Sequence, residues 1–259
     1  MRVEQLGEGT PDVAVVAGIH GDEPCGVQAV ESILSDPPAV ERPVKFVVAN
    51  EAAIDQGVRY VDADLNRSFP GDADATAHET RLAAELTAEV SSCTTLSLHS
   101  TCSQAEPFAV VEEVDDLARK ILPALSVDTV VATGSFVEGR LFASAGVVEV
   151  ECGLQGSDAA ADNAQQLITE FLAALGVLDV PVERRAHPLY RLTRLIPKPE
   201  ADEYEVFAEN FERVGVGERY AAADGAALRA DEPFYPVLLS ADGYESLLGY
   251  AAESVGTIP

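Results

Sequence analysis

Positive charge is scarce in this chain of 259 residues. Lys and Arg together number 17 against 44 Asp and Glu, which gives a formal net charge of −27, and the isoelectric point of the sequence is about 4.2. Only three of the cationic residues are lysines, namely Lys45, Lys120 and Lys198. Because so acidic a surface repels nucleic acid and anionic lipid, we expect neither a nucleic acid nor a membrane as a partner.

Long apolar runs and paired cysteines are also missing. No stretch approaches the roughly 20 apolar residues of a membrane-spanning helix, and residues 1–9 contain no apolar segment typical of a signal peptide. The four cysteines, Cys25, Cys93, Cys102 and Cys152, include no Cys-x-x-Cys pair. This spacing favours reduced thiols over a disulfide framework, so we expect a cytoplasmic protein.

The apolar pattern alternates between strands and helices over the first two thirds of the chain. Runs of apolar, often β-branched residues predict buried strands at 13–17, 43–49, 94–99 and 145–151, with further strands at 106–111 and 129–132. Helical spacing predicts helices at 24–36, 79–90, 112–122 and 158–175, and a long irregular loop at 51–77. This alternation predicts an α/β fold with a mixed, largely parallel sheet between helix layers.

The composition changes near residue 178. From there onward, short apolar pieces are interrupted repeatedly by proline and glycine, which predicts a small β-rich unit. We therefore expect two domains, at 1–178 and 179–259.

A His-x-x-Glu pair follows the first buried strand. His20 and Glu23 lie on the turn between the strand at 13–17 and the next helix, and open α/β sheets bind ligands at that edge. Imidazole and carboxylate are both zinc ligands, and this spacing leaves them free to converge on one ion. The alternative is a solvated polar pair on a surface turn.

Two arginines and an asparagine stand out in the loop that follows. Arg59, Asn66 and Arg67 lie among acidic residues, and arginine can pair with a carboxylate through two parallel hydrogen bonds. The alternative is that the arginines only neutralise neighbouring acids such as Asp64.

Two strand ends carry further candidates. His99 ends the strand at 94–99, where it can reach the same sheet edge as His20, although a structural histidine is the alternative. Glu151 follows a run of valines, and partial burial there would raise its pKa and suit it to general acid/base chemistry. Glu149 points to the same face and competes for that role, and an ion-paired carboxylate is the alternative for either.

Four segments taken in order resemble one family. Residues 18–24, residues 64–71, His99 and residues 151–153 resemble the succinylglutamate desuccinylase/aspartoacylase family of the zinc carboxypeptidase superfamily. The resemblance covers nearly the whole chain. It implies a zinc-carboxypeptidase-like catalytic domain and a C-terminal domain that narrows the active-site entrance. It also implies hydrolysis of an N-acylated acidic amino acid, of N-succinylglutamate or N-acetylaspartate type, to the acyl acid and the free amino acid.

The resemblance further implies roles for individual residues. One Zn²⁺ per chain would be held by His20, Glu23 and His99. Glu151 would be the general base, favoured over Glu149 by the family pattern Glu-x-Gly followed by Gln155, and Arg59 would stabilise the oxyanion. The substrate-binding residues would be Asn66, Arg67, Arg140 and Tyr244, with Arg140 one residue farther from the base than the family spacing predicts.

Two other functions stay open at this point. A zinc carboxypeptidase acting on peptides would need an open groove at the site. A catalytically silent metal-binding relative is expected to lack at least one member of the metal and catalytic set. The expected partner is a small anionic N-acyl amino acid, and the sequence leaves open whether the chain forms a homo-oligomer.

The excess of negative charge predicts dependence on salt. Like charges repel one another in the compact state unless salt screens them, and the Debye length falls to roughly 3 Å at 1 M salt. We therefore infer a protein from a high-salt cell, the alternative being an acidic mesophilic protein. The midpoint of thermal unfolding should rise as KCl increases from dilute to molar, and a falling midpoint would contradict this inference.

Overall fold

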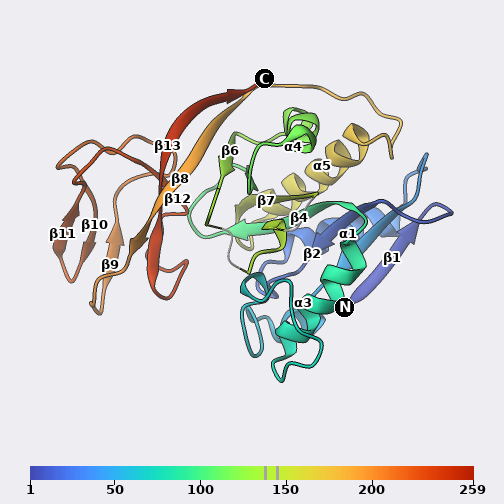
Figure 1. Ribbon diagram of the computed structural model, residues 1–259, viewed down its shortest axis with the longest axis horizontal. Coiled ribbons are helices and arrows are strands. Elements are labelled where there is room, and N and C mark those ends of the chain that lie inside the picture. The colour runs from blue at the N-terminus through green and yellow to red at the C-terminus, as the bar shows by residue number, and fades with distance from the viewer. Residues whose placement is uncertain (137–138, 144–145) are drawn as a thin grey trace.

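The main sheet contains two groups of parallel strands that meet at one antiparallel pair in its middle (Figure 1). The computed structural model describes residues 1–136, 139–143 and 146–259. Within these residues, ten strands make up the sheet, in the order β1 (Arg2–Leu6), β3 (Val44–Val48), β2 (Val13–Ala17), β4 (Thr94–Thr101), β7 (Val147–Leu154), β5 (Phe108–Val111), β6 (Thr129–Ala132), β8 (His187–Pro197), β13 (Leu247–Ile258) and β12 (Tyr235–Val237). The pairs β3–β2, β2–β4, β4–β7, β5–β6 and β6–β8 are parallel. The predicted mixed, largely parallel sheet is confirmed.

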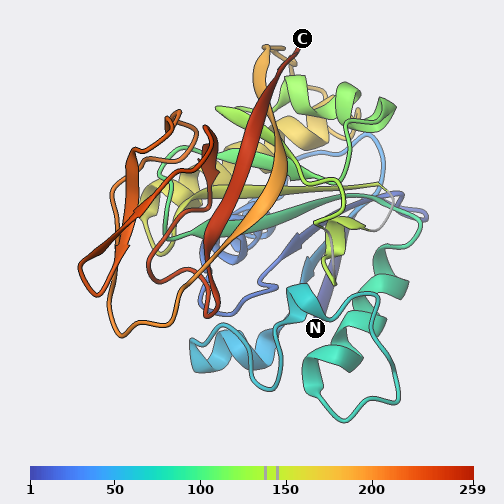
Figure 2. The same cartoon turned by 60° about the vertical axis from the view of Figure 1, so that its left-hand side comes forward.

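Helices cover both faces of this sheet (Figure 2). One face packs against α1 (Cys25–Ser35), α4 (Asp116–Ile121) and α5 (Asp158–Ala174), and the other against α3 (His78–Val90). Because side chains alternate along a strand, Val13, Val15 and Ala17 face the first core and Ala14 and Val16 the second. The remaining described helices are short: α2 (Glu51–Gln56), η1 (Leu65–Arg67), η2 (Leu122–Ala124) and η3 (Leu141–Ala143).

The chain after residue 178 contributes to two sheets. β8, β12 and β13 extend the main sheet, whereas β9 (Tyr204–Val206), β10 (Arg219–Ala223) and β11 (Ala226–Arg229) form a small antiparallel sheet at one end of the molecule (Figure 1). A third core that includes Ile196, Phe234 and Leu248 joins the two. The division into domains at 1–178 and 179–259 stays a prediction. No helix among the described residues is long and apolar enough to cross a membrane.

Three local differences from the predicted elements have simple physical reasons. β1 is an edge strand whose middle residues are exposed, so it shows no apolar run. α2 lies inside the predicted irregular loop, because a helix of six residues held by the Asn50 cap is too short for periodicity. α4 begins at Asp116, four residues later than predicted, because the side chain of Asp115 caps it. Ala145, in the strand predicted at 145–151, lies outside the described residues.

Helix α1 approaches the central strands very closely at Gly26. A Cβ atom placed on Gly26 would lie 2.9 Å from Cβ of Leu98 and 3.1 Å from Cβ of Ala17. Contacts this short leave no room for a side chain. The turn before α1 and the end of β4 carry candidate site residues, so this packing also sets how far apart they lie.

A Gly26→Val substitution should therefore destabilise the protein. Overpacking of this kind costs about 1–3 kcal/mol in the free energy of unfolding, which urea denaturation measures directly. Gln28→Ala, on the exposed side of the same helix, is the matched control and should change stability by no more than about 0.5 kcal/mol. Equal stability of Gly26→Val and the parent protein would show that the contact is not tight.

Candidate functional site

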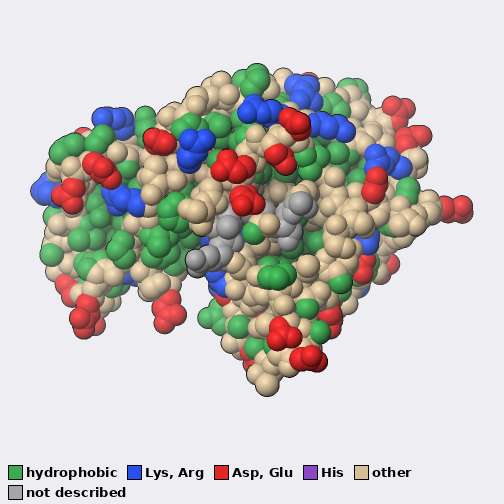
Figure 3. Space-filling model, in the orientation of Figure 1, with side chains coloured by type: hydrophobic (Ala, Val, Ile, Leu, Met, Phe, Trp, Pro, Cys, Tyr) green, Lys and Arg blue, Asp and Glu red, His purple; other side chains and the backbone are tan. Residues whose placement is uncertain are grey.

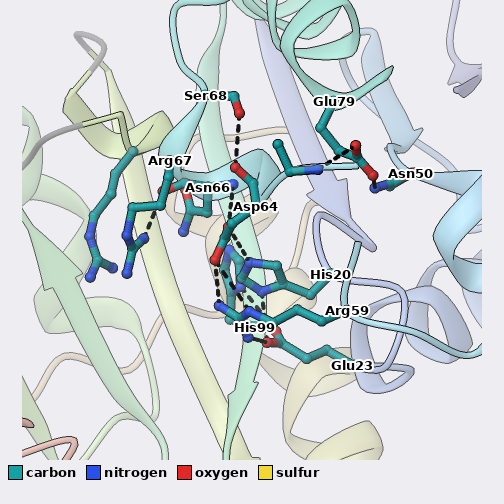
Figure 4. Close-up of polar contacts among 12 residues, drawn as sticks. His20, Glu23, Asn50, Arg59, Asp64, Asn66, Arg67, Ser68, Glu79 and His99 are labelled. Carbon is teal, nitrogen blue, oxygen red and sulfur yellow. Dashed lines mark hydrogen bonds and ion pairs between the residues drawn. The ribbon is translucent and has the colours of Figure 1, made fainter. Parts of the chain in front are cut away.

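His20, Glu23 and His99 form one buried cluster at the carboxyl ends of β2 and β4 (Figure 4). Nδ1 of His20 lies 2.7 Å from Oε1 of Glu23, and Nδ1 of His99 lies 3.0 Å from Oε2. The Glu23 carboxylate also accepts the backbone N–H of Ser100 at 3.1 Å. One donor atom from each of the three residues lies within 4.8 Å of the others. Two imidazoles and a carboxylate suit zinc, so the cluster is able to hold a metal ion.

The charges in the cluster shift the pKa values of its members. Burial raises the pKa of Glu23, but the two histidines outweigh it and hold that pKa well below its usual range. Burial lowers the pKa of His99, but Glu149 and Glu23 outweigh it and raise that pKa to about 10. The surrounding carboxylates therefore favour positive charge at the position of His99.

A second carboxylate faces the far side of each imidazole. Nε2 of His20 lies 3.1 Å from Oδ1 of Asp64, and Nε2 of His99 lies 3.5 Å from Oε2 of Glu149. In metal sites, such outer carboxylates orient the imidazole and increase its basicity. From the sequence alone, Asp64 is predicted only as a charge partner of arginine and Glu149 only as a competing base. A signal for Asp64 was available in the sequence, because it lies two residues before Asn66. In the structure, Asp64 accepts the backbone N–H of Asn66.

Arg59 lies beside the cluster and pairs with two carboxylates. Its Nη1 is 3.2 Å from Oε1 of Glu23, and its Nη2 is 3.2 Å from Oδ2 of Asp64. The turn that carries His20 is tied to this arginine, because the N–H of Gly21 donates to the Arg59 carbonyl. A Cβ on Gly21 would lie only 2.2 Å from the backbone of Ala53, so this approach requires glycine.

Glu151 lies next to His99, because β4 and β7 pair in parallel with these two residues opposite each other. Its side chain is 8% exposed, and its Oε2 atom has no hydrogen-bond partner among the described residues. Burial raises the pKa of Glu151 to about 8, with Glu23 and Glu149 adding to the rise and His99 and Arg140 opposing it. A carboxyl group with this pKa can exchange a proton near neutral pH.

Asn66 and Arg67 differ in how far their side chains are already engaged. Asn66 is buried: its Nδ2 donates to Glu149 at 3.2 Å, and its Oδ1 accepts the N–H of Leu141 at 3.1 Å. Arg67 is exposed, donates to the Asn66 carbonyl at 2.7 Å, and forms no ion pair with any described residue. Figure 4 shows its guanidinium to one side of the cluster. Arg67 is thus available to an anionic ligand.

Arg140 and two tyrosines lie deeper in the same region. Nη2 of Arg140 donates to the Tyr250 hydroxyl at 2.9 Å, and its Nη1 lies 3.9 Å from Oε1 of Glu149. The Tyr244 ring meets that of Tyr250 edge to face, with centroids 6.0 Å apart. Burial raises the pKa of Tyr244 to about 12 although Arg140 opposes the shift, so this hydroxyl stays protonated at neutral pH.

One cavity joins these groups. Its lining includes all nine residues singled out from the sequence: His20, Glu23, Arg59, Asn66, Arg67, His99, Arg140, Glu151 and Tyr244. One wall comes from the segment between β12 and β13, through Leu238, Ser240 and Gly243. Figure 3 shows the molecule notched between the small-sheet lobe and the rest, with acidic side chains at the lower tips of that lobe.

The fold and the cluster define a class of protein, a zinc-carboxypeptidase-like α/β fold with a buried His-Glu-His set at the sheet edge. The sequence model of the succinylglutamate desuccinylase/aspartoacylase catalytic domain matches residues 9–175. The chain belongs to this family, as the resemblance predicted. No curated protein sequence matches the chain.

Solved structures with the same fold cover nearly the whole chain. The ectoine utilization protein EutE (DoeB) of Ruegeria pomeroyi, solved with product bound, has a TM-score of 0.77 at 17% identity over 99% of this chain and 88% of its own. Murine aminoacylase 3 has a TM-score of 0.74 at 21% identity over 97% and 99%. Succinylglutamate desuccinylase of Vibrio parahaemolyticus has a TM-score of 0.71 at 20% identity over 95% and 82%.

A buried carboxylate outside the cavity holds the loop that carries Arg59 and Asp64. Glu79 of α3 is fully buried and accepts the backbone N–H groups of Val61, Asp62 and Ala63 at 2.6, 2.9 and 3.0 Å (Figure 4 shows it with Asn50). Burial raises the pKa of Glu79, but these hydrogen bonds outweigh it and lower that pKa below its usual value. Glu79 is not predictable from the sequence, because three of its partners are main-chain N–H groups.

Replacing Glu79 with Gln should therefore destabilise the fold in a pH-dependent way. Because the folded pKa is lowered, the ionised carboxylate stabilises the protein above its unfolded pKa of about 4.3, and this is lost as the pH falls through the folded pKa. Urea denaturation of Glu79→Gln should show a loss of about 1–3 kcal/mol at pH 7 and a smaller loss below about pH 4. The exposed Glu85→Gln on the same helix is the control. A loss that is equal at both pH values would argue against the assigned hydrogen bonds.

Proposed function

We propose that the protein is a zinc-dependent amidohydrolase that cleaves the amide bond of an N-acylated acidic amino acid. The substrate would be of the N-succinylglutamate or N-acetylaspartate type, and the products would be the acyl acid and the free amino acid. The observation that carries this proposal is the buried His20–Glu23–His99 cluster with Glu151 directly opposite His99. Family membership supports it, since relatives with this fold are named as a succinylglutamate desuccinylase and an aminoacylase.

His20, Glu23 and His99 would hold one Zn²⁺ per chain, and three protein ligands leave a position open at the metal. When bound, zinc supplies a Lewis acid and lowers the pKa of its water toward about 7. Glu151, with its raised pKa, takes the proton of the attacking water and returns it to the leaving amine. Both proton transfers then use the same carboxyl group.

The cationic residues of the cavity would bind and polarise the substrate. Arg59 stabilises the oxyanion that develops at the scissile carbonyl, a contribution of several kcal/mol in comparable sites. Asn66 and Arg67 bind the α-carboxylate, and Arg67 has no competing ion pair among the described residues. Arg140 binds the second carboxylate, and Tyr244 presents its hydroxyl to the pocket.

The proposal also assigns roles to the two predicted domains and to the acidic composition. Residues 1–178 form the catalytic domain, and residues 179–259 form a β-rich domain that narrows the entrance through Tyr244. A wall of this kind disfavours an extended peptide, which argues against a carboxypeptidase acting on peptides. The complete metal and catalytic set argues against a silent relative. The composition, with a net charge of −27, supports work in the cytoplasm of a high-salt cell.

Purified protein loaded with zinc in molar KCl tests the function directly. It should hydrolyse at least one member of a panel of N-acetyl and N-succinyl aspartates and glutamates, lose that activity on chelation and regain it with zinc. A higher rate on C-terminal amino acids of peptides than on the whole panel would favour the carboxypeptidase instead.

Two substitutions separate metal binding from the chemistry. Glu151→Gln should keep one zinc per chain, because Glu151 is not in the ligand set, yet lose about 10²–10⁴-fold in kcat. His20→Ala should lose the metal itself, as metal analysis of the purified variant would show. Unchanged activity in Glu151→Gln would contradict the assignment of Glu151 as the general base.

A further inference from the structure

A second buried carboxylate lies inside the cavity, and the reaction proposed above assigns it no proton transfer and no contact with the substrate. Glu149 is 1% exposed and lines the cavity from β7, on the same face as Glu151. Oε2 accepts from Nδ2 of Asn66 at 3.2 Å and lies 3.5 Å from Nε2 of His99. Oε1 lies 3.9 Å from Nη1 of Arg140. Asn66 is a hydrogen-bond donor to Glu149, and His99 and Arg140 place positive charge near it. Such surroundings suit an ionised carboxylate.

Glu149 therefore offsets the charge of Arg140 in the part of the cavity where the proposed function needs a cation. Nη2 of Arg140 is engaged by the Tyr250 hydroxyl, and its Nη1 faces Glu149. A substrate side-chain carboxylate bound at Arg140 would lie close to the buried negative charge of Glu149. Like charges repel strongly where water is excluded, so the gain from the arginine is reduced.

Arg67 is in a different situation. It is exposed at the cavity, and no described carboxylate lies within ion-pair distance of it. One substrate carboxylate can therefore be bound at Arg67 without competition, whereas a second carboxylate meets both Arg140 and Glu149. The α-carboxylate of an N-acyl amino acid and the group at the end of its side chain therefore meet different charges in the cavity.

We propose that Glu149 is a specificity-determining residue that widens the substrate class to N-acyl amino acids with polar uncharged side chains as well as acidic ones. This inference rests on the proposed function. An amide side chain can accept from Arg140 and donate to Glu149, whereas a carboxylate can only accept. Glu149 thus favours the amide relative to the acid of the same shape.

The test compares two substrates that differ only in this group. With N-acetylaspartate and N-acetylasparagine, or the same pair carrying whichever acyl group the panel selects, kcat/KM of the parent protein should differ by less than about tenfold. Glu149→Gln should raise the acid-to-amide ratio by about tenfold or more. The ratio is unaffected by partial loss of zinc or of folded protein, because both substrates meet the same active molecules.

Two further variants connect the effect to its proposed cause. In an Arg140→Gln background, Glu149→Gln should no longer raise the ratio, because the cation that would bind the acid is gone. Glu106→Gln removes an exposed carboxylate outside the cavity and should leave the ratio unchanged. An unchanged ratio in Glu149→Gln, or a parent ratio above about tenfold in favour of the acid, overturns the role of Glu149 and leaves the proposed function intact. If the zinc-loaded protein hydrolyses no N-acetyl or N-succinyl aspartate or glutamate and none of the corresponding amides, the proposed function is overturned and this role with it.

Discussion

The buried carboxylate of Glu23 is the constraint on which the site depends. A carboxylate that is 5% exposed is stable only with positive or donor groups around it. Here those groups are two imidazoles, the Arg59 guanidinium and the backbone N–H of Ser100. They come from the turn after β2, the following loop and the end of β4, so one charge brings together segments that are far apart in the chain. A metal ion in the cluster would take over the same role.

The cavity gathers three arginines in a molecule that has few cationic residues. The chain carries a net charge of −27, yet Arg59, Arg67 and Arg140 line one cavity. Each of these arginines is in a different state. Arg59 is paired with carboxylates of the cluster and its loop, Arg140 faces Glu149 and a tyrosine hydroxyl, and Arg67 is exposed. An anionic ligand therefore meets a graded set of cations rather than a uniform positive patch.

Much of the fold and of the candidate set could be predicted from the sequence, because both follow from local patterns. Strands appear as apolar runs, and His20 and His99 could be placed at strand ends that share one edge of a parallel sheet. The misses were elements without such a pattern, namely the exposed edge strand β1 and the short helix α2. Glu79 was missed for a related reason, since its hydrogen bonds go to backbone atoms, whose positions no residue type reveals.

The sequence by itself determined which residues are available at the sheet edge, because motif spacing and turn residues act over a few positions. Only the tertiary structure decided what each side chain touches there. The role of Asn66 at a substrate carboxylate stays a proposal, and only the structure shows that its amide also donates to Glu149 and accepts the N–H of Leu141. These contacts span 83 and 75 positions of the chain. They exist because strand register and helix packing set distances to a fraction of an ångström, which residue spacing alone does not encode.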